Sequence, residues 1–226
     1  MRWWSTIVLC CALTLSGQVG EVTGRIRVTS TLTKRRISVP QVYERAAAIA
    51  VEPPPPADVG AELRRVVVYL DTPGLAARPR QARMNQHQRR FEPEVLAVPV
   101  GSTVSFPNGD PIFHNVFSLS KVKPLDLGNY KEGESRSVTF HQAGIVQLFC
   151  HLHPNMSGAV LVTPNGWFTQ PAENGDFALA EVPPGRYVLV AWHKSAGLFR
   201  RTIEVRAGQA VQVDFEIPLS EPVSRK

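Results

Sequence analysis

Cysteine is scarce in this chain of 226 residues, and its three cysteines are unevenly placed. Cys10 and Cys11 lie in the N-terminal apolar segment, so a chain processed after that segment keeps Cys150 alone. A lone thiol forms no internal disulfide and no Cys-x-x-Cys redox pair. An exposed thiol is a liability in an oxidising compartment, and we therefore expect Cys150 to be protected by burial or by a metal ion.

Long apolar runs are missing as well. The apolar segment 7–15 follows Arg2 and precedes small and polar residues, a pattern typical of a secretory signal. It is shorter than the ~20 residues that a spanning helix needs, although an uncleaved anchor is the alternative, and we expect no membrane span after it. We predict that residues 1–16 are a signal peptide and that the mature protein is periplasmic.

Strong charge of one sign is also absent. The charged fraction is 19% against a hydrophobic fraction of 43%, which indicates a folded chain rather than a disordered one. The net charge is +6, and after an export signal nucleic acid is a poor partner, so we expect steering towards acidic protein partners. Five arginines concentrate the positive charge and would equally fit a solvated connecting segment: Arg78, Arg80, Arg83, Arg89 and Arg90.

Proline and glycine are plentiful, with 19 and 16 residues, and they separate short apolar segments. Alternation within these segments predicts an all-β protein. We expect strands at 21–29, 65–70, 94–100, 102–106, 115–119, 135–140, 144–149, 158–163, 176–180, 186–192, 199–206 and 210–218. A short helix at 41–50 and a stiff polyproline spacer at 53–56 are the predicted exceptions.

The strand spacing predicts two β-sandwiches. Residues 84–163 form the first, residues 164–218 a smaller second one, and residues 219–226 a tail. Residues 17–83 hold an N-terminal β segment and the proline-rich linker. Because the second sandwich has too few strands to close alone, we expect the N-terminal strands to complete it, with the first sandwich inserted between them.

A metal-binding pattern stands between two of the predicted strands. The sequence CHLHPNM places Cys150, His153 and Met156 at three-residue intervals, and His114 stands upstream beside another turn. A thiolate and two imidazoles with a weak axial thioether suit copper in both oxidation states. The site then rearranges little when one electron arrives or leaves. We therefore predict one copper ion held by these four residues.

Other interpretations of the same residues are open. Cys150 and Met156 alone would be ordinary core residues. Zinc accepts Cys and His, but a thioether is an unusual zinc ligand and structural zinc sites favour more thiolates. Nucleophilic Cys/His catalysis with His114 or His153 would need an orienting Asn or Asp and an oxyanion hole, which the sequence does not place.

The residues around the ligands resemble a cupredoxin. The pattern is Phe91-Glu92-Pro93, Val98-x-Val100-Gly101-x-x-Val104-x-Phe106-x-Asn108-x-Asp110, His114-Asn115-Val116, and Gly144-x-Val146-x-x-x-Cys150 with His153 and Met156. The short ligand loop resembles amicyanin and the plastocyanin-like proteins of methylamine utilisation. The resemblance implies a Greek-key β-sandwich with one type 1 copper ion, for which His114, Cys150 and His153 are the strong ligands and Met156 the axial one.

The resemblance also assigns roles around the metal. Asn115 would tie the loop of the first ligand to the loop that carries Cys150. Four apolar residues would surround the edge of His153, as a docking patch or equally as core: Ile112, Phe113, Leu152 and Pro154. His151 is an extra imidazole, but its place at a strand end turns its side chain away from the metal. The remaining histidines show no ligand spacing: His87, His141 and His193.

The C-terminal pattern Gly175-x-Phe177 to Pro184-Gly185-x-Tyr187 resembles the carboxypeptidase regulatory-like sandwich, an Ig-like or transthyretin-like accessory fold without peptidase activity. The resulting hypothesis is an exported electron carrier, not an enzyme, that exchanges single electrons with redox protein partners. The alternatives are a copper-delivery module that acts through the C-terminal sandwich, and a subunit that serves one oxidase or dehydrogenase.

Overall fold

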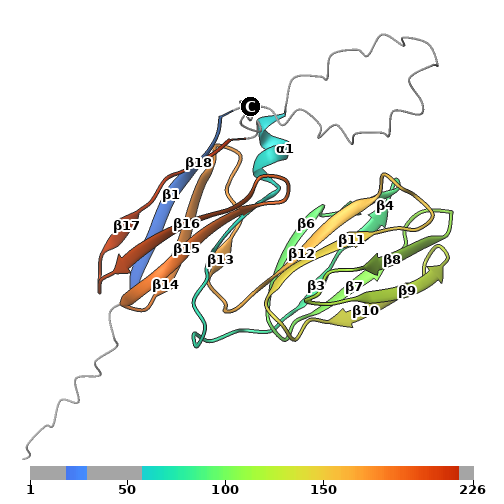
Figure 1. The fold of residues 1–226 in the computed structure, drawn as a ribbon, viewed down its shortest axis with the longest axis horizontal. Coiled ribbons are helices and arrows are strands. Elements are labelled where there is room, and N and C mark those ends of the chain that lie inside the picture. The colour runs from blue at the N-terminus through green and yellow to red at the C-terminus, as the bar shows by residue number, and fades with distance from the viewer. Residues whose placement is uncertain (1–18, 30–57, 219–226) are drawn as a thin grey trace, which may run out of the picture.

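The computed structural model describes residues 19–29 and 58–218 (Figure 1). In these ranges the regular structure is almost entirely β-strand, as predicted, with one short helix, α1 (Val59–Leu63). The predicted signal peptide, the helix at 41–50, the polyproline spacer and the tail lie outside the described residues. Within the described part, no helix has the length and apolar character needed to cross a membrane.

The first sandwich consists of two sheets, with strand orders β10-β7-β3 and β6-β12-β11-β8-β9. Its strands are β3 (Gln81–Arg83), β6 (Val95–Pro99), β7 (Thr103–Pro107), β8 (His114–Ser118), β9 (Leu125–Tyr130), β10 (Ser135–Thr139), β11 (Gly144–Phe149) and β12 (Ser157–Thr163), with a separate hairpin of β4 (Asn85–His87) and β5 (Arg90–Glu92). Because β3 pairs with β7, this sandwich begins upstream of the predicted boundary at residue 84. Alternate side chains fill its core, including Val104, Phe106 and Val146.

The second sandwich joins both ends of the described chain. Its sheets have the orders β14-β1-β17, with β18 also paired to β1, and β13-β2-β15-β16. The strands are β1 (Gly20–Val28), β2 (Val66–Leu70), β13 (Phe168–Thr169), β14 (Asp176–Val182), β15 (Gly185–His193), β16 (Gly197–Val205), β17 (Ala210–Gln212) and β18 (Phe215–Ile217). Figure 1 shows β1, in blue, among the orange and red strands, so the first sandwich is an insertion between β2 and β13.

The two sandwiches pack face to face through one sheet each. We call this contact the interface core. Its buried residues come from β2 and β15 on one side and β6 and β12 on the other: Val67, Tyr69, Val190 and Trp192 against Val95, Ala97, Ala159 and Leu161. All five residues of β2 are buried, because Val67 and Tyr69 face the interface core and the other three, Val66, Val68 and Leu70, face the second sandwich's own core. A strand covered on both faces is continuously apolar, which explains the sequence VVVYL.

Several elements differ from the sequence prediction. The strands β3, β4, β5, β9 and β13 and the helix α1 were not predicted. Gly128-Asn129 was expected to be a turn, but both residues lie within β9. Gly128 has φ +66 there, and the register between β8 and β9 shifts nearby. A positive φ inside a strand is available to glycine at little cost, so glycine signals an irregular strand here rather than its end.

Candidate metal centre

Three of the predicted ligands meet at one end of the first sandwich. Cys150 follows β11 and is 4% exposed, His114 opens β8, and His153 lies in the turn between β11 and β12. The Cys150 Sγ lies 3.9 Å from His114 Nδ1 and 3.6 Å from His153 Nδ1. In the described ranges this is the one group of three or more His, Cys, Asp or Glu side chains with ligand atoms all within 4.8 Å of one another.

The turn between β11 and β12 brings the loop ligands to one side. The His153 amide donates to the Cys150 carbonyl at 3.4 Å, and the Met156 amide donates to the His153 carbonyl at 2.9 Å. Two successive four-residue β-turns therefore carry Cys150, His153 and Met156. Met156 is 1% exposed and packs in the same core cluster as Cys150, so its thioether is kept from solvent.

The spacing of these atoms fits a metal ion. A thiolate and an imidazole bound to one first-row metal at about 2.3 and about 2.0 Å, with an angle of about 120°, lie about 3.7 Å apart. The two sulfur–nitrogen distances of 3.6 and 3.9 Å bracket that value. A single thiolate with two imidazoles and a buried thioether is a softer donor set than zinc usually takes, and it favours copper.

Asp110 fixes the orientation of His114. Its Oδ2 lies 2.8 Å from His114 Nε2, and the His114 side chain is fully buried. Because an ionised carboxylate only accepts hydrogen bonds, His114 donates through Nε2–H and its Nδ1 lone pair is left for a metal. Burial raises the pKa of Asp110, but hydrogen bonds from the Arg89 amide, His114 and the Gln88 amide outweigh it and hold the pKa below its ordinary value.

Asp110 also holds the β4–β5 turn. The amides of Gln88 and Arg89 donate to its two carboxylate oxygens at 2.7 and 2.8 Å. Both residues have positive φ, 50 and 56, a conformation that non-glycine residues adopt at a cost. The turn is therefore maintained by the same carboxylate that orients His114, and the positive charge of Arg89 in this turn lowers the pKa of His153.

Asn115 joins the two ligand-bearing loops, as predicted. Its side-chain oxygen accepts a hydrogen bond from the His151 amide at 3.4 Å, and its side-chain nitrogen donates to Asp126 at 2.7 Å. The Asn115 backbone amide points to Cys150 Sγ at 3.4 Å. An amide donor stabilises a thiolate, so this residue both ties the loops and supports the charged form of the ligand.

His153 is the ligand nearest to solvent. Its ring centroid lies 4.7 Å from that of His114. Burial lowers the pKa of His153, the neighbouring His114 and Arg89 lower it further, and Asp110 acts in the opposite direction. A lowered pKa keeps the imidazole neutral near pH 7, which is the form that binds metals.

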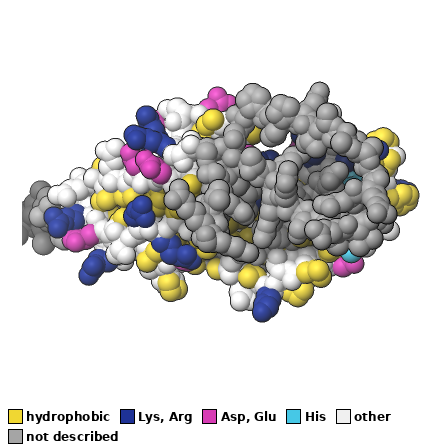
Figure 2. All heavy atoms as spheres, turned by 45° about the horizontal axis from the view of Figure 1, so that its top comes forward, with side chains coloured by type: hydrophobic (Ala, Val, Ile, Leu, Met, Phe, Trp, Pro, Cys, Tyr) yellow, Lys and Arg dark blue, Asp and Glu magenta, His cyan; other side chains and the backbone are white. Residues whose placement is uncertain are grey.

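The apolar residues around His153 lie at the surface rather than in the core. Phe113 is 56% exposed and Leu152 is 45% exposed; Pro154 is exposed and Ile112 half-buried. Figure 2 shows hydrophobic side chains, in yellow, at the right-hand end of the molecule with histidine, in cyan, nearby. Of the two interpretations open from the sequence, the surface patch is the one that the exposure supports.

The other histidines are placed as the sequence predicts. His151 stacks on Phe117 with ring centroids 3.7 Å apart and planes 1° from parallel, so its side chain is directed away from the ligand group. His193 is fully buried against Glu62, and His141 is exposed. His87 lies 3.5 Å from Asp110 at the edge of the site without joining the ligands.

Sequence reasoning missed two features of the site. Asp110 was noted as part of a motif but not as the partner of His114, although the four-residue spacing of the two is a usable signal. The five arginines divide between roles that no local pattern distinguishes. Arg89 and Arg90 are exposed at the β4–β5 turn, whereas Arg80 donates to the Ala97 carbonyl at 2.7 Å and lies 5.0 Å from the Phe168 ring centroid.

In comparisons with known proteins, no protein-family model and no curated protein matches the chain, whereas several solved structures resemble part of it. A copper-containing nitrite reductase from Thermus scotoductus SA-01 is 27% identical over 36% of this chain, with a TM-score of 0.35, and the match spans only 22% of that reductase chain. A purple cupredoxin from Nitrosopumilus maritimus is 23% identical over 36% of this chain and 99% of its own, with a TM-score of 0.34. A reduced variant of amicyanin is 27% identical over 43% of this chain and 98% of its own, with a TM-score of 0.35. At TM-scores of this size, the side chains of this protein, rather than the likeness, carry the assignment of function.

Proposed function

We propose that the chain is an exported cupredoxin that carries single electrons on one type 1 copper ion. The observation that carries this proposal is the buried Cys150 sulfur, which lies 3.6 and 3.9 Å from two imidazole nitrogens, with Met156 in the same core. When bound, copper would supply a one-electron Cu(II)/Cu(I) couple. The periplasm is the proposed compartment, on the strength of the signal-like segment 1–16.

The protein's own contribution is preorganisation. His114 is held by Asp110, Cys150 is held by the Asn115 amide, and His153 is fixed by the hydrogen-bonded turn that contains it. Ligands that are already in place before a metal binds cannot shift far between two oxidation states. Small rearrangement is the condition for fast electron exchange, and it favours a carrier over a protein that must release its metal.

Electrons would pass through the His153 edge to a redox protein. Phe113 and Leu152 offer an exposed apolar contact there, and Arg89, exposed in the β4–β5 turn that Asp110 holds, adds positive charge at this end. A partner with an acidic rim around an apolar centre would fit this surface.

We expect the rate of electron exchange with such a partner to fall as the salt concentration rises, because salt screens the attraction between the charges. The variant Arg89→Gln should weaken this dependence on salt. An exchange rate that does not change with salt would contradict electrostatic steering.

The test is a visible and electron paramagnetic resonance spectrum of the copper-loaded protein, with Cys150→Ser as the key variant. We expect an intense thiolate-to-copper band and reversible one-electron voltammetry in the original chain. Cys150→Ser should lose the band while keeping its β-sheet circular dichroism. His151→Ala is the matched control, because its side chain is directed away from the ligands, and it should keep the band.

The same measurements separate the alternatives. A delivery protein would bind Cu(I) preferentially, lose metal readily and give no reversible Cu(II) state. A coloured Cys150→Ser variant would overturn the ligand set. We also propose, from the sequence pattern alone, that the second sandwich is a carboxypeptidase regulatory-like accessory fold.

A further inference from the structure

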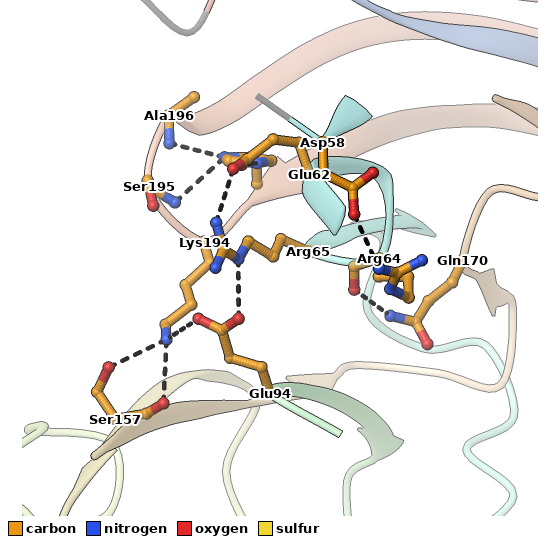
Figure 3. A network of polar contacts seen from close by, with 11 residues as sticks. Asp58, Glu62, Arg64, Arg65, Glu94, Ser157, Gln170, Lys194, Ser195 and Ala196 are labelled. Atoms are coloured by element: carbon orange, nitrogen blue, oxygen red, sulfur yellow. Dashed lines mark hydrogen bonds and ion pairs between the residues drawn. The ribbon is translucent and has the colours of Figure 1, made fainter. Parts of the chain in front are cut away.

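The contact between the two sandwiches ends in a polar network beside the metal loop, which is the turn between β11 and β12 that carries Cys150, His153 and Met156. The interface core is apolar, but at its edge charged side chains from both sandwiches meet in the arrangement of Figure 3. Glu94, which precedes β6, accepts hydrogen bonds from Lys194 Nζ at 2.6 Å and from Arg65 Nε at 2.8 Å. Lys194 and Arg65 belong to the second sandwich, so Glu94 joins the two units.

The network continues inward and is balanced in charge. Arg65 also donates to Glu62 at 2.7 Å, and Glu62 lies 3.0 Å from Nε2 of the fully buried His193. His193 Nδ1 accepts two backbone amides, from Ser195 and Ala196, so its Nε2 carries the proton that Glu62 accepts. Two carboxylates face two cations around a neutral imidazole, an arrangement that keeps partly buried charges paired.

Lys194 reaches beyond this network to the metal loop. Its Nζ lies 3.2 Å from both the carbonyl oxygen and the hydroxyl oxygen of Ser157. With Glu94 these are three acceptors for the three N–H groups of an ammonium, and the side chain is only 11% exposed. Ser157 directly follows Met156 and opens β12. A fully bonded cation of the second sandwich therefore holds the residue next to the proposed axial ligand.

We propose that Lys194 is a positioning residue of the metal centre, so that the second sandwich sets where Met156 lies. This inference rests on the proposed copper function. Lys194 holds Ser157 through both its backbone carbonyl and its hydroxyl, and a Ser157 residue fixed at these two points limits how far the adjacent Met156 can move. The accessory sandwich then has a physical role: it braces the side of the ligand loop that the first sandwich's own hydrogen bonds to Cys150 and His114 leave free.

The experiment compares Lys194→Met, Lys194→Arg and the control Lys131→Met in the full chain. Lys194→Met keeps the length and apolar stem but removes all three donors, whereas Lys131 is exposed in the first sandwich, away from this network. In the metal-free protein, we expect amide exchange of residues 156–158 to accelerate about tenfold in Lys194→Met alone. In the copper-loaded protein, that variant should lose copper about 10-fold faster or more and change its charge-transfer spectrum.

Lys194→Arg should restore part of the slow exchange and the original spectrum, because a guanidinium can still donate to Glu94 and Ser157. If Lys194→Met unfolds, Ser157→Ala keeps the lysine and its pairing with Glu94 and should reproduce the spectral change at smaller size. An unchanged spectrum and exchange rate in Lys194→Met would overturn the inference. A wild-type protein without a thiolate-to-copper band would instead overturn the proposed function, and the metal-free exchange rates would still decide whether Lys194 braces the loop.

Discussion

The two sandwiches of this protein treat buried polar side chains differently. The first buries several of them at its metal end: Asn108, Asp110, His114 and Asn115, all hydrogen-bonded. The core of the second sandwich is also apolar, with Val22, Leu189 and Phe215, and its two fully buried polar side chains have separate partners: Asn165 bonds to the Leu70 carbonyl and His193 to Glu62. Burying a polar group costs free energy unless it is bonded, so a bonded cluster at one end indicates selection for a site rather than for packing.

The contact between the sandwiches contains both apolar packing and bonded polar side chains. Its centre is apolar, around Trp192, and its edge is the paired-charge network of Glu94 and Lys194. An apolar centre provides most of the free energy of association, whereas the pairing at the edge keeps the partly buried charges bonded. This contact is therefore the place where the second sandwich, through Lys194, touches the residue next to Met156 in the proposed metal site.

The largest effect is expected from Trp192→Ala, which opens a cavity between the facing sheets. We expect the free energy of unfolding to fall by about 3–5 kcal/mol, because the removed ring leaves neighbours on both sides without contacts. Thermal unfolding measures the loss, and amide exchange shows where it acts. Exchange should rise in β6 and β12 as well as in β2 and β15. Phe215→Ala, in the second sandwich's own core, should raise it in that sandwich only. The same restricted pattern in Trp192→Ala would mean that the two units are not coupled.

A smaller effect on stability, but a clear one on the site, is expected from Asp110→Ala. The change leaves buried His114 Nε2 and the Gln88 and Arg89 amides without their acceptor, which costs about 1–3 kcal/mol of stability. Because His114 also loses its orientation, we expect metal affinity to fall by about 10–100-fold, measured by competition with a chelator. His87→Ala serves as the control, since its exposed ring only borders Asp110. Equal affinity in Asp110→Ala would show that the buried polar cluster does not orient the ligand.

The smallest effect is expected from the pH dependence of the Glu94 network. Burial raises the pKa of Glu94, but hydrogen bonds from Lys194 and Arg65 outweigh it and lower the pKa below its ordinary value of 4.5. Its contribution to stability is thus present above pH 4.5 and is lost as the pH falls through the folded pKa. Glu94 is 36% exposed, so solvent screening limits the contribution to roughly 1 kcal/mol or less. Denaturant titrations from pH 7 to pH 3 should show that the free energy of unfolding falls less with acid in Glu94→Gln than in the original chain. Identical profiles would show that the Glu94 network does not stabilise the contact.

Much of the metal site could be predicted from local spacing. Cys150, His153 and Met156 stand three residues apart, and short turns bring such residues to one side wherever the loop lies. The all-β class followed from alternation, since inward and outward side chains repeat every two residues. The β4–β5 hairpin was not predictable in this way. Its residues are mostly polar, and its turn is held by Asp110, which is distant in the sequence.

The sequence by itself determined the chemistry of the donor set and the strand periodicity, because both depend on residue type and on neighbours along the chain. Only the tertiary structure decided that Asp110 holds the Gln88 and Arg89 amides, that Phe113 is exposed and that Lys194 reaches Ser157. The last contact spans 37 residues and joins two sandwiches. Such pairings arise from how whole sheets pack, which is a property of buried surfaces distributed over the chain and not of any short pattern within it.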